Sequence, residues 1–228
     1  MGLAGRCHFD NQVSRLNLAV SGGADSVAML ILAAETGRPL TVVHVDHGLR
    51  SSSEAEAGQV RDLAEQFGAE FVLHELDLVT GANLEERARL ARYAVYPDEV
   101  AVAHTVEDQA ETVLLAMLRG AGLDGLSGMA NVGPGPDPAR LQLVFRPILG
   151  LRRAETEQLC ASRGVATIED PSNRDSAYRR SRIRYELLPL MADIADRDVA
   201  AGVARLAGLL ADEKSLLDDL ADQIDPCD

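Results

Sequence analysis

Apolar residues alternate with polar ones, or form short continuous runs, at four places in the first half of the chain. These runs predict β-strands over residues 16–20, 40–46, 71–76 and 99–104. Each run is followed by helical periodicity, which predicts one helix that carries Val27–Ile31 and later helices that reach residues 67, 96 and 119. Strands that are joined through helices form parallel sheets with right-handed crossovers. The pattern therefore predicts an α/β fold in which a parallel sheet carries helices on both faces.

The second half of the chain has a different pattern. Nine glycines and prolines between residues 120 and 139 argue against a helix there and predict a long loop, which could serve as a lid or be partly disordered. Beyond this loop, the sequence predicts an extended segment over 141–145 and helices over 152–163, 179–191 and 196–221. The last helix carries an apolar stripe that needs a partner surface to be buried.

Residues 21–26 join the first strand to the first helix with the sequence Ser-Gly-Gly-Ala-Asp-Ser. Gly22 and Gly23 have no Cβ, so backbone N–H groups can face an approaching anion. The helix N-terminus behind them adds N–H groups and a partial positive charge. The two serines add hydroxyl donors, and Asp25 is placed to hold a divalent metal that rides on phosphate oxygens. The loop matches neither GxxxxGK[ST] nor GxGxxG, and an ordinary turn is the alternative interpretation.

Polar residues follow the predicted strands at their carboxyl ends. They are Asp25, Asp46, His47, His104 and Asp108. Because ligands of parallel α/β sheets collect at that edge, this convergence predicts one site. Asp108 and Glu111 are three residues apart and share one helix face. Acids in a first helical turn also stabilise the helix, as Arg119 would at the other end, so the spacing alone leaves both interpretations open.

The length of 228 residues suffices for one α/β domain and a small appendage, and 46% hydrophobic residues support a real core. No apolar run reaches membrane-spanning length, and residues 1–10 contain no apolar signal region. Cys7, Cys160 and Cys227 are far apart and form no CxxC pair. This spacing argues against a zinc knuckle, an iron–sulfur site or a disulfide framework, and it suits a reducing cytoplasm.

The charge is unevenly distributed along the chain. A formal net charge of −14 is unusual for a protein that binds nucleic acid. Residues 140–185 nevertheless carry 10 arginines against 5 acidic residues. An arginine-rich segment on an acidic protein can engage phosphates, in a way that depends strongly on salt.

The loop over residues 21–26 resembles the pyrophosphate-binding loop of the N-type ATP pyrophosphatases (the PP-loop superfamily). Further segments extend the resemblance, and they lie at residues 44–50, 83–89, 108–112, 119–129, 146–149 and 169–175. Together, over roughly residues 16–190, they resemble the tRNA(Ile)-lysidine synthetase family. The resemblance implies an adenine nucleotide alpha hydrolase-like fold over residues 1–190. It implies that residues 191–228 are a helical linker or the start of a truncated C-terminal domain.

The resemblance also implies an activity. Enzymes of this family use ATP to adenylate the C2 oxygen of the wobble cytidine in tRNA(Ile) with a CAU anticodon. The ε-amine of L-lysine then displaces AMP and gives lysidine. The implied cofactors are ATP and Mg²⁺, the implied location is the cytoplasm without a membrane, and the family pattern allows a homodimer.

Roles for individual residues follow from the family pattern. The residues implied to hold the pyrophosphate end of ATP are Ser21, Gly22, Gly23, Ala24, Asp25 and Ser26, with Asp25 also implied as a Mg²⁺ ligand. Asp46 and His47 are implied to lie beside the nucleotide, Asp108 and Glu111 to face the lysine, and Arg119 to face the tRNA or the activated base. The implied catalytic set is therefore Asp25, Asp46, His47, Asp108, Glu111 and Arg119.

Four further arginines, Arg179, Arg180, Arg182 and Arg184, are candidates to grip tRNA phosphates, with a solvated arginine-rich helix as the alternative. Two other functions compete with lysidine synthesis. Another PP-loop enzyme is one, but a tRNA thiolase needs paired cysteines and an amidating ligase usually brings a glutaminase domain or partner. A non-catalytic ATP-binding module is the other, and in it Asp25, Asp108 and Glu111 would be dispensable.

Overall fold

The computed structural model describes residues 2–10, 13–46, 48, 53–77, 81, 84–168 and 179–223. The chain forms two compact units. The first unit comprises residues 1–104 and 131–169, and the second comprises residues 105–130 and 170–228. The domain division expected at residue 190 concerns family domains rather than these units, and it stays a prediction.

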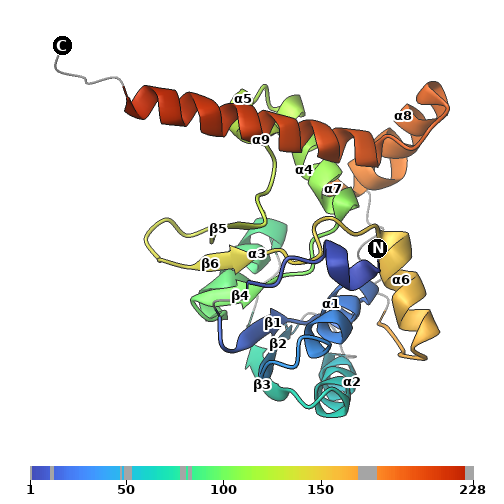
Figure 1. The fold of residues 1–228 in the computed structure, drawn as a ribbon. Coiled ribbons are helices and arrows are strands. Elements are labelled where there is room, and N and C mark those ends of the chain that lie inside the picture. The colour runs from blue at the N-terminus through green and yellow to red at the C-terminus, as the bar shows by residue number, and fades with distance from the viewer. Residues whose placement is uncertain are drawn as a thin grey trace. The chain divides into compact units, whose positions relative to one another are not determined.

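The first unit is built on a six-stranded sheet with the order β3-β2-β1-β4-β6-β5 (Figure 1). Its strands are β1 (Leu16–Ala19), β2 (Leu40–Asp46), β3 (Glu70–Glu75), β4 (Glu99–Ala101), β5 (Val132–Pro134) and β6 (Leu143–Phe145). Every pairing is parallel except that of β5 with β6, which is antiparallel. The predicted parallel sheet is confirmed, with one antiparallel strand added at its edge.

The long loop predicted over residues 120–139 is wrong in part. It contains the edge strand β5 and a one-turn helix, α5 (Leu123–Leu126). Its glycines and prolines do not prevent the strand, because β5 pairs with β6 as a hairpin. The Gly135 N–H donates to the Gln142 carbonyl at 2.9 Å, and the Arg146 N–H donates to the Asn131 carbonyl at 2.7 Å.

Helices cover both faces of the sheet, as the sequence predicts. They are α1 (Ala24–Ala34), α2 (Ser53–Gln66), α3 (Leu84–Val95) and α6 (Arg153–Ser162). Successive strand residues point to opposite faces. Accordingly Leu18 and Val42 join the core that contains residues of α1, α2 and α6, whereas Ala19 and Val43 join a smaller core with Tyr93 of α3.

The second unit is helical. Its elements are α4 (Val106–Leu118), α5, α7 (Arg179–Arg182), a π-helical turn (Ile183–Leu187), α8 (Leu188–Ala195) and α9 (Ala200–Asp222). Ala110 and Leu114 of α4 pack against Ile183, Leu188 and Ala200. The helix predicted from residue 196 begins at residue 200 instead, because Asp196 adopts a left-handed conformation (φ 48°) that ends α8.

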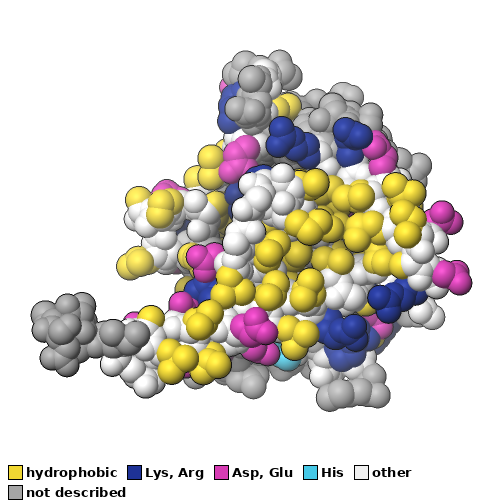
Figure 2. Space-filling view, turned by 90° about the horizontal axis from the view of Figure 1, so that it is seen from above, with side chains coloured by type: hydrophobic (Ala, Val, Ile, Leu, Met, Phe, Trp, Pro, Cys, Tyr) yellow, Lys and Arg dark blue, Asp and Glu magenta, His cyan; other side chains and the backbone are white. Residues whose placement is uncertain are grey.

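The apolar stripe of α9 is only partly covered. Ala200 and Ala207 are buried, but five leucines on other sides of the helix are exposed: Leu206, Leu209, Leu216, Leu217 and Leu220. Figure 2 shows apolar side chains along this exposed side. Among the described residues, no helix is both long and apolar enough to cross a bilayer.

Candidate functional site

The turn between β1 and α1 depends on a glycine at position 22. Gly22 has a φ of +90°, which side chains rarely allow. A Cβ on Gly22 would lie 2.4 Å from the Ile168 side chain and 3.2 Å from that of Val60. The Gly22 carbonyl in turn accepts a hydrogen bond from the Ile168 N–H at 2.9 Å. Only glycine therefore fits this position without displacing its neighbours.

Backbone donors of the loop remain available to a ligand. Within the part of the chain that the structure describes, the N–H groups of Gly22, Ala24 and Ser26 have no acceptor. They lie at the N-terminus of α1, where the helix dipole also favours an anion. The loop therefore offers open donors to an anion, and phosphate binding by residues 21–26 stays a prediction.

The serine hydroxyls take part in the loop's own hydrogen bonds. The Ser26 hydroxyl donates to the Gly23 carbonyl at 2.9 Å and accepts from the Ser21 N–H at 3.2 Å. The Ser21 hydroxyl lies 3.3 Å from that of Ser26, and Ser21 is exposed whereas Ser26 is buried. Ser26 therefore shapes the loop, and Ser21 is the serine that a ligand can reach.

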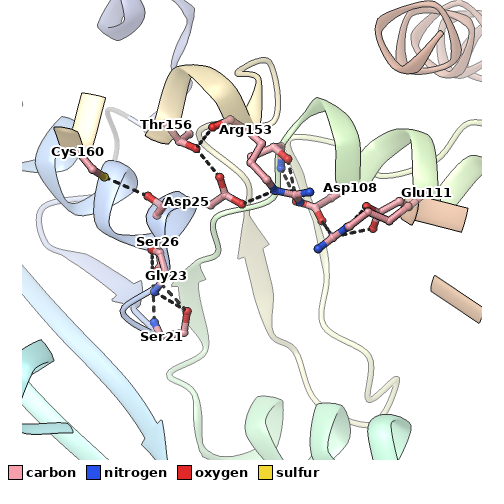
Figure 3. A network of polar contacts seen from close by, with 12 residues as sticks. Ser21, Gly23, Asp25, Ser26, Asp108, Glu111, Arg153, Thr156 and Cys160 are labelled. Carbon is pink, nitrogen blue, oxygen red and sulfur yellow. Dashed lines mark hydrogen bonds and ion pairs between the residues drawn. The ribbon is translucent and has the colours of Figure 1, made fainter. Parts of the chain in front are cut away.

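Asp25 has partners that the sequence gave no reason to expect. The Thr156 hydroxyl donates to Asp25 Oδ1 at 2.5 Å, and Arg153 Nε lies 3.3 Å from Asp25 Oδ2 (Figure 3). Both partners come from α6, and they lie three residues apart on one face of it. The predicted helix over 152–163 contains that spacing, but no pattern in the sequence connects it to a loop more than a hundred residues earlier.

The carboxyl edge of the sheet also carries Asp46. Because β1 and β2 are parallel with Ala19 opposite Val43, the loop after β1 and Asp46 at the end of β2 lie at the same edge of the sheet. Asp46 Oδ1 accepts the Gly48 N–H at 2.8 Å. His47, the other residue predicted to lie beside the nucleotide, falls outside the described residues. Across the described ranges, no three His, Cys, Asp or Glu side chains form a ready-made metal cage.

The second unit holds the predicted carboxylate pair in a cluster of charges. Arg184 Nε lies 2.5 Å from Glu111 Oε1, and Arg180 Nε lies 2.7 Å from Glu111 Oε2. Asp108 Oδ1 contacts Nη2 of Arg184 at 3.2 Å and Nη2 of Arg180 at 3.4 Å. Asp108 Oδ2 also accepts hydrogen bonds from the N–H and the hydroxyl of Thr105, each at 2.9 Å. Thr105 directly precedes α4, so these bonds cap the start of that helix. Two carboxylates thus neutralise two guanidinium groups.

This cluster is closed around Glu111, which has 0% of its side chain exposed. Burial acts to lower the pKa of Arg184, but the hydrogen bond and charge of Glu111 and the charge of Asp108 outweigh it and raise that pKa. Both arginines are therefore bound to carboxylates, although the sequence suggested that they grip tRNA. The other two arginines differ, since Arg179 is exposed and Arg182 pairs with Glu186 at 2.9 Å on the surface.

Arg119 is separated from the carboxylates. It follows the last residue of α4 and is exposed, whereas Asp108 lies in the first turn. At 1.5 Å per residue the two positions are about 16 Å apart along the helix. Within the second unit, the structure therefore joins Asp108 with Glu111 but not with Arg119. Whether the carboxylates and the loop over residues 21–26, called the phosphate loop after its predicted ligand, form one site stays a prediction.

The sequence profile described as the PP-loop domain matches residues 5–191. The chain belongs to the PP-loop domain family. Within this family, the tRNA(Ile)-lysidine synthase of Novosphingobium aromaticivorans is 44% identical over 196 residues, covering 80% of this chain and 60% of that protein. The enzyme of the same name from Nocardia farcinica is 36% identical over 220 residues, covering 94% of this chain and 67% of that protein. The resemblance inferred from the sequence is confirmed, and this PP-loop chain spans 60–67% of the length of these two relatives.

A solved structure confirms the PP-loop fold. The U34-tRNA thiolase NcsA from Methanococcus maripaludis, solved with its [4Fe-4S] cluster, has a TM-score of 0.67. The alignment covers 92% of this chain and 77% of the thiolase. At 14% identity, this likeness shows the fold and leaves the chemistry open.

Proposed function

We propose that this chain catalyses the ATP-dependent ligation of lysine to C2 of the wobble cytidine in tRNA(Ile) with a CAU anticodon. The reaction passes through an adenylated tRNA and releases pyrophosphate and AMP. Extensive identity to proteins named tRNA(Ile)-lysidine synthase supports this substrate set. The observation that carries the ATP step is the loop over residues 21–26, whose N–H groups at Gly22, Ala24 and Ser26 have no acceptor among the described residues.

In this proposal the loop holds the pyrophosphate end of ATP. Its N–H groups and the N-terminus of α1 offset the charge that develops on the departing pyrophosphate. A Mg²⁺ ion fits this setting because magnesium keeps water and phosphate ligands and needs only one or two carboxylates. Asp25 is the carboxylate within the loop, and Asp46 lies at the same edge of the sheet. When bound, the metal would supply charge stabilisation on the phosphate oxygens.

Lysine is assigned to the Asp108–Glu111 pair. The free ε-amine has a pKa of about 10.4, so it arrives as a cation that carboxylates attract. Because Glu111 is buried and both its oxygens contact arginines, lysine must take the place of a guanidinium there. We infer that Arg180 or Arg184 swings out when lysine binds and becomes available to tRNA phosphate. Asp108, with 11% of its side chain exposed, is the more accessible of the two acids.

The decisive assay offers the tRNA(Ile) transcript with a CAU anticodon, ATP and radiolabelled lysine. We expect label in the tRNA together with AMP and pyrophosphate. Asp25→Ala is expected to abolish pyrophosphate release with the circular dichroism spectrum unchanged, because it removes the carboxylate of the loop. Glu213→Ala, at an exposed acid on α9, serves as the control and should react like the parent chain. Unchanged turnover in Asp25→Ala would remove the assignment of the loop.

The lysine site is tested separately with Asp108→Asn, which keeps the shape of the side chain. We expect the lysine concentration needed for half-maximal rate to rise about tenfold or more, since a charged hydrogen-bond partner is lost. Pyrophosphate release without lysine should be largely retained. An unaltered lysine requirement would place lysine elsewhere.

Two features of the proposal rest on family resemblance alone. The cytoplasm is the expected location, because the proposed substrates are tRNA, ATP and lysine. A homodimer is expected to be detectable by sedimentation equilibrium of the chain at micromolar concentration. A mass that stays monomeric over a hundredfold range of concentration would remove the dimer and leave the reaction unaffected.

A further inference from the structure

One face of α6, together with the residues that follow it, supports the phosphate loop from behind. Arg153, Thr156 and Cys160 have helical i, i+3 and i+7 spacing and all contact the loop (Figure 3). The first two contact the Asp25 carboxylate, and the Cys160 thiol donates to the Ala24 carbonyl at 3.4 Å. After α6, Ile168 covers Gly22 and donates to its carbonyl. A single segment therefore contacts three residues of the loop, Gly22, Ala24 and Asp25.

Asp25 creates a problem for an anion site. A carboxylate in the first turn of a helix is attracted to the open N–H groups of that turn, as N-terminal acids generally are. If Asp25 bent back onto the loop, it would occupy donors intended for phosphate and add a negative charge beside them. The structure instead holds both Asp25 oxygens toward α6.

We propose that Thr156 is a positioning residue that keeps the Asp25 carboxylate turned away from the loop N–H groups, so that these groups stay open to phosphate. The proposal rests on the proposed binding of ATP by this loop. Arg153 assists by offsetting the charge of Asp25. Neither residue has been given a role by the sequence pattern.

The setting of the Thr156 hydroxyl makes this role specific. Thr156 has 0% of its surface exposed, so water cannot replace its hydroxyl. Its one proton has two acceptors in reach, Asp25 Oδ1 at 2.5 Å and the Arg153 carbonyl at 2.7 Å. The ionised acceptor is the stronger of the two, because hydrogen bonds to charged groups are about twice as strong as neutral ones. The bond to Asp25 is therefore the one that orients a side chain.

The helix that presents Thr156 is itself anchored. Arg6 pairs with both oxygens of Glu155, at 2.5 and 3.0 Å, and donates to the Gly150 carbonyl at 2.6 Å. Glu155 Oε2 also accepts the Arg152 N–H at 2.8 Å at the start of α6. A positioning group on such a fixed element holds its target more closely than one on a loop.

The test measures ATP binding by calorimetry with the full chain. Thr156→Val removes the hydroxyl and keeps the shape, and we expect affinity for ATP to fall about tenfold to a hundredfold. Thr156→Ser keeps the hydroxyl and should restore most of the affinity. Thr36→Val is the matched control, because the Thr36 hydroxyl lies at the far end of α1, where it donates to the Ala33 carbonyl and accepts from Arg38. Circular dichroism and thermal unfolding verify that each variant folds.

A double-mutant cycle isolates the mechanism from a general packing effect. In an Asp25→Ala background there is no carboxylate to turn inward, so adding Thr156→Val should leave ATP affinity unchanged. Equal losses from Thr156→Val with and without Asp25 would overturn the positioning role. So would an unchanged affinity in the single variant, provided that the parent chain binds ATP. If the parent chain binds no ATP, the proposed function fails first, and Thr156 has nothing to position.

Discussion

Polar groups remain open to a ligand at the phosphate loop of the first unit, whereas the charges in the carboxylate cluster of the second unit pair with one another. At the loop, one carboxylate is held by a hydroxyl and a guanidinium while neighbouring N–H groups of Gly22, Ala24 and Ser26 stay open within the described chain. At the cluster, two carboxylates and two guanidinium groups satisfy one another, and Glu111 is completely buried.

The difference shows what each region needs before it can accept a ligand. The loop is already arranged for an anion, so a ligand gains its hydrogen bonds without a large rearrangement. The cluster is neutral and closed, so a cationic ligand must displace a cation that is already there. Buried ion pairs of this kind lose much stability when one partner is removed, because the remaining charge is left without compensation. Substitutions in both regions test this contrast.

Glu111→Ala should have the largest effect on stability. It leaves Arg180 and Arg184 without their main partner, and we expect the free energy of unfolding to fall by about 3–5 kcal/mol. Asp25→Ala should cost about 1–2 kcal/mol, since Arg153 is 24% exposed and can turn to water. Glu186→Ala breaks an exposed pair with Arg182 and should change the stability least of the three. Urea unfolding of the three variants measures the change in the free energy of unfolding. Equal losses in Glu111→Ala and Asp25→Ala would contradict the difference between the two regions.

Gly22→Ala should affect the loop alone. The new Cβ meets Ile168 at 2.4 Å with a φ of +90°, so we expect a loss of about 1–3 kcal/mol in stability and of more than tenfold in ATP affinity. Gly202→Ala, in α9 with nothing within 4 Å of the new Cβ, should instead stabilise the chain by about 0.5–1 kcal/mol. Normal ATP binding by Gly22→Ala would show that the loop tolerates a side chain at position 22 and would contradict this expectation.

Arg119→Glu and Arg179→Glu should weaken tRNA binding moderately. Both residues are exposed, so they can reach phosphates without leaving an internal partner. Each lost contact should reduce the slope of log affinity against log salt by about 1. Filter binding at several salt concentrations measures the slope, with the exposed Arg205→Glu as the control. Slopes equal to that of the control would show that neither Arg119 nor Arg179 contacts tRNA phosphate.

Glu155→Gln should have a small effect on stability, present near neutral pH and absent in acid. The hydrogen bond from Arg6, opposed by burial, holds the pKa of Glu155 below its ordinary value. The stabilisation is therefore present above pH about 4.5 and is lost as the pH falls through the lower pKa of the folded state. With 37% and 29% of the two side chains exposed, it should stay below about 1 kcal/mol. Acid unfolding should begin at higher pH in Glu155→Gln than in the exposed control Glu157→Gln.

Much of the architecture could be predicted from the sequence because it depends on local patterns. The four strands of the first half and the helices between them follow from apolar periodicity and helix-end signals. The edge strand β5 could not be predicted in this way, since it exists only by pairing with β6. The family followed from the residues of the loop and of six further segments, and the comparisons confirm it.

The candidate site likewise could be predicted from the sequence only where it depends on neighbouring residues. The loop over residues 21–26 was predictable, because its conformation is dictated by Gly22 and by the start of a helix. The partners of Asp25 were not, because Thr156 and Arg153 approach from another helix. Nor were the pairs that join Arg180 and Arg184 to the carboxylates of α4, since a basic residue in a sequence is equally suited to an internal acid and to an external phosphate.

The sequence by itself therefore determined most of the strands and helices, the position of the glycine turn before α1 and the family to which the chain belongs. These properties are encoded by neighbouring residues, whose backbone preferences act over a few positions. Tertiary structure alone decided which charges are neutralised inside the protein and which remain for a ligand. That choice depends on side chains brought together from distant segments, where burial removes water and makes each unpaired charge costly.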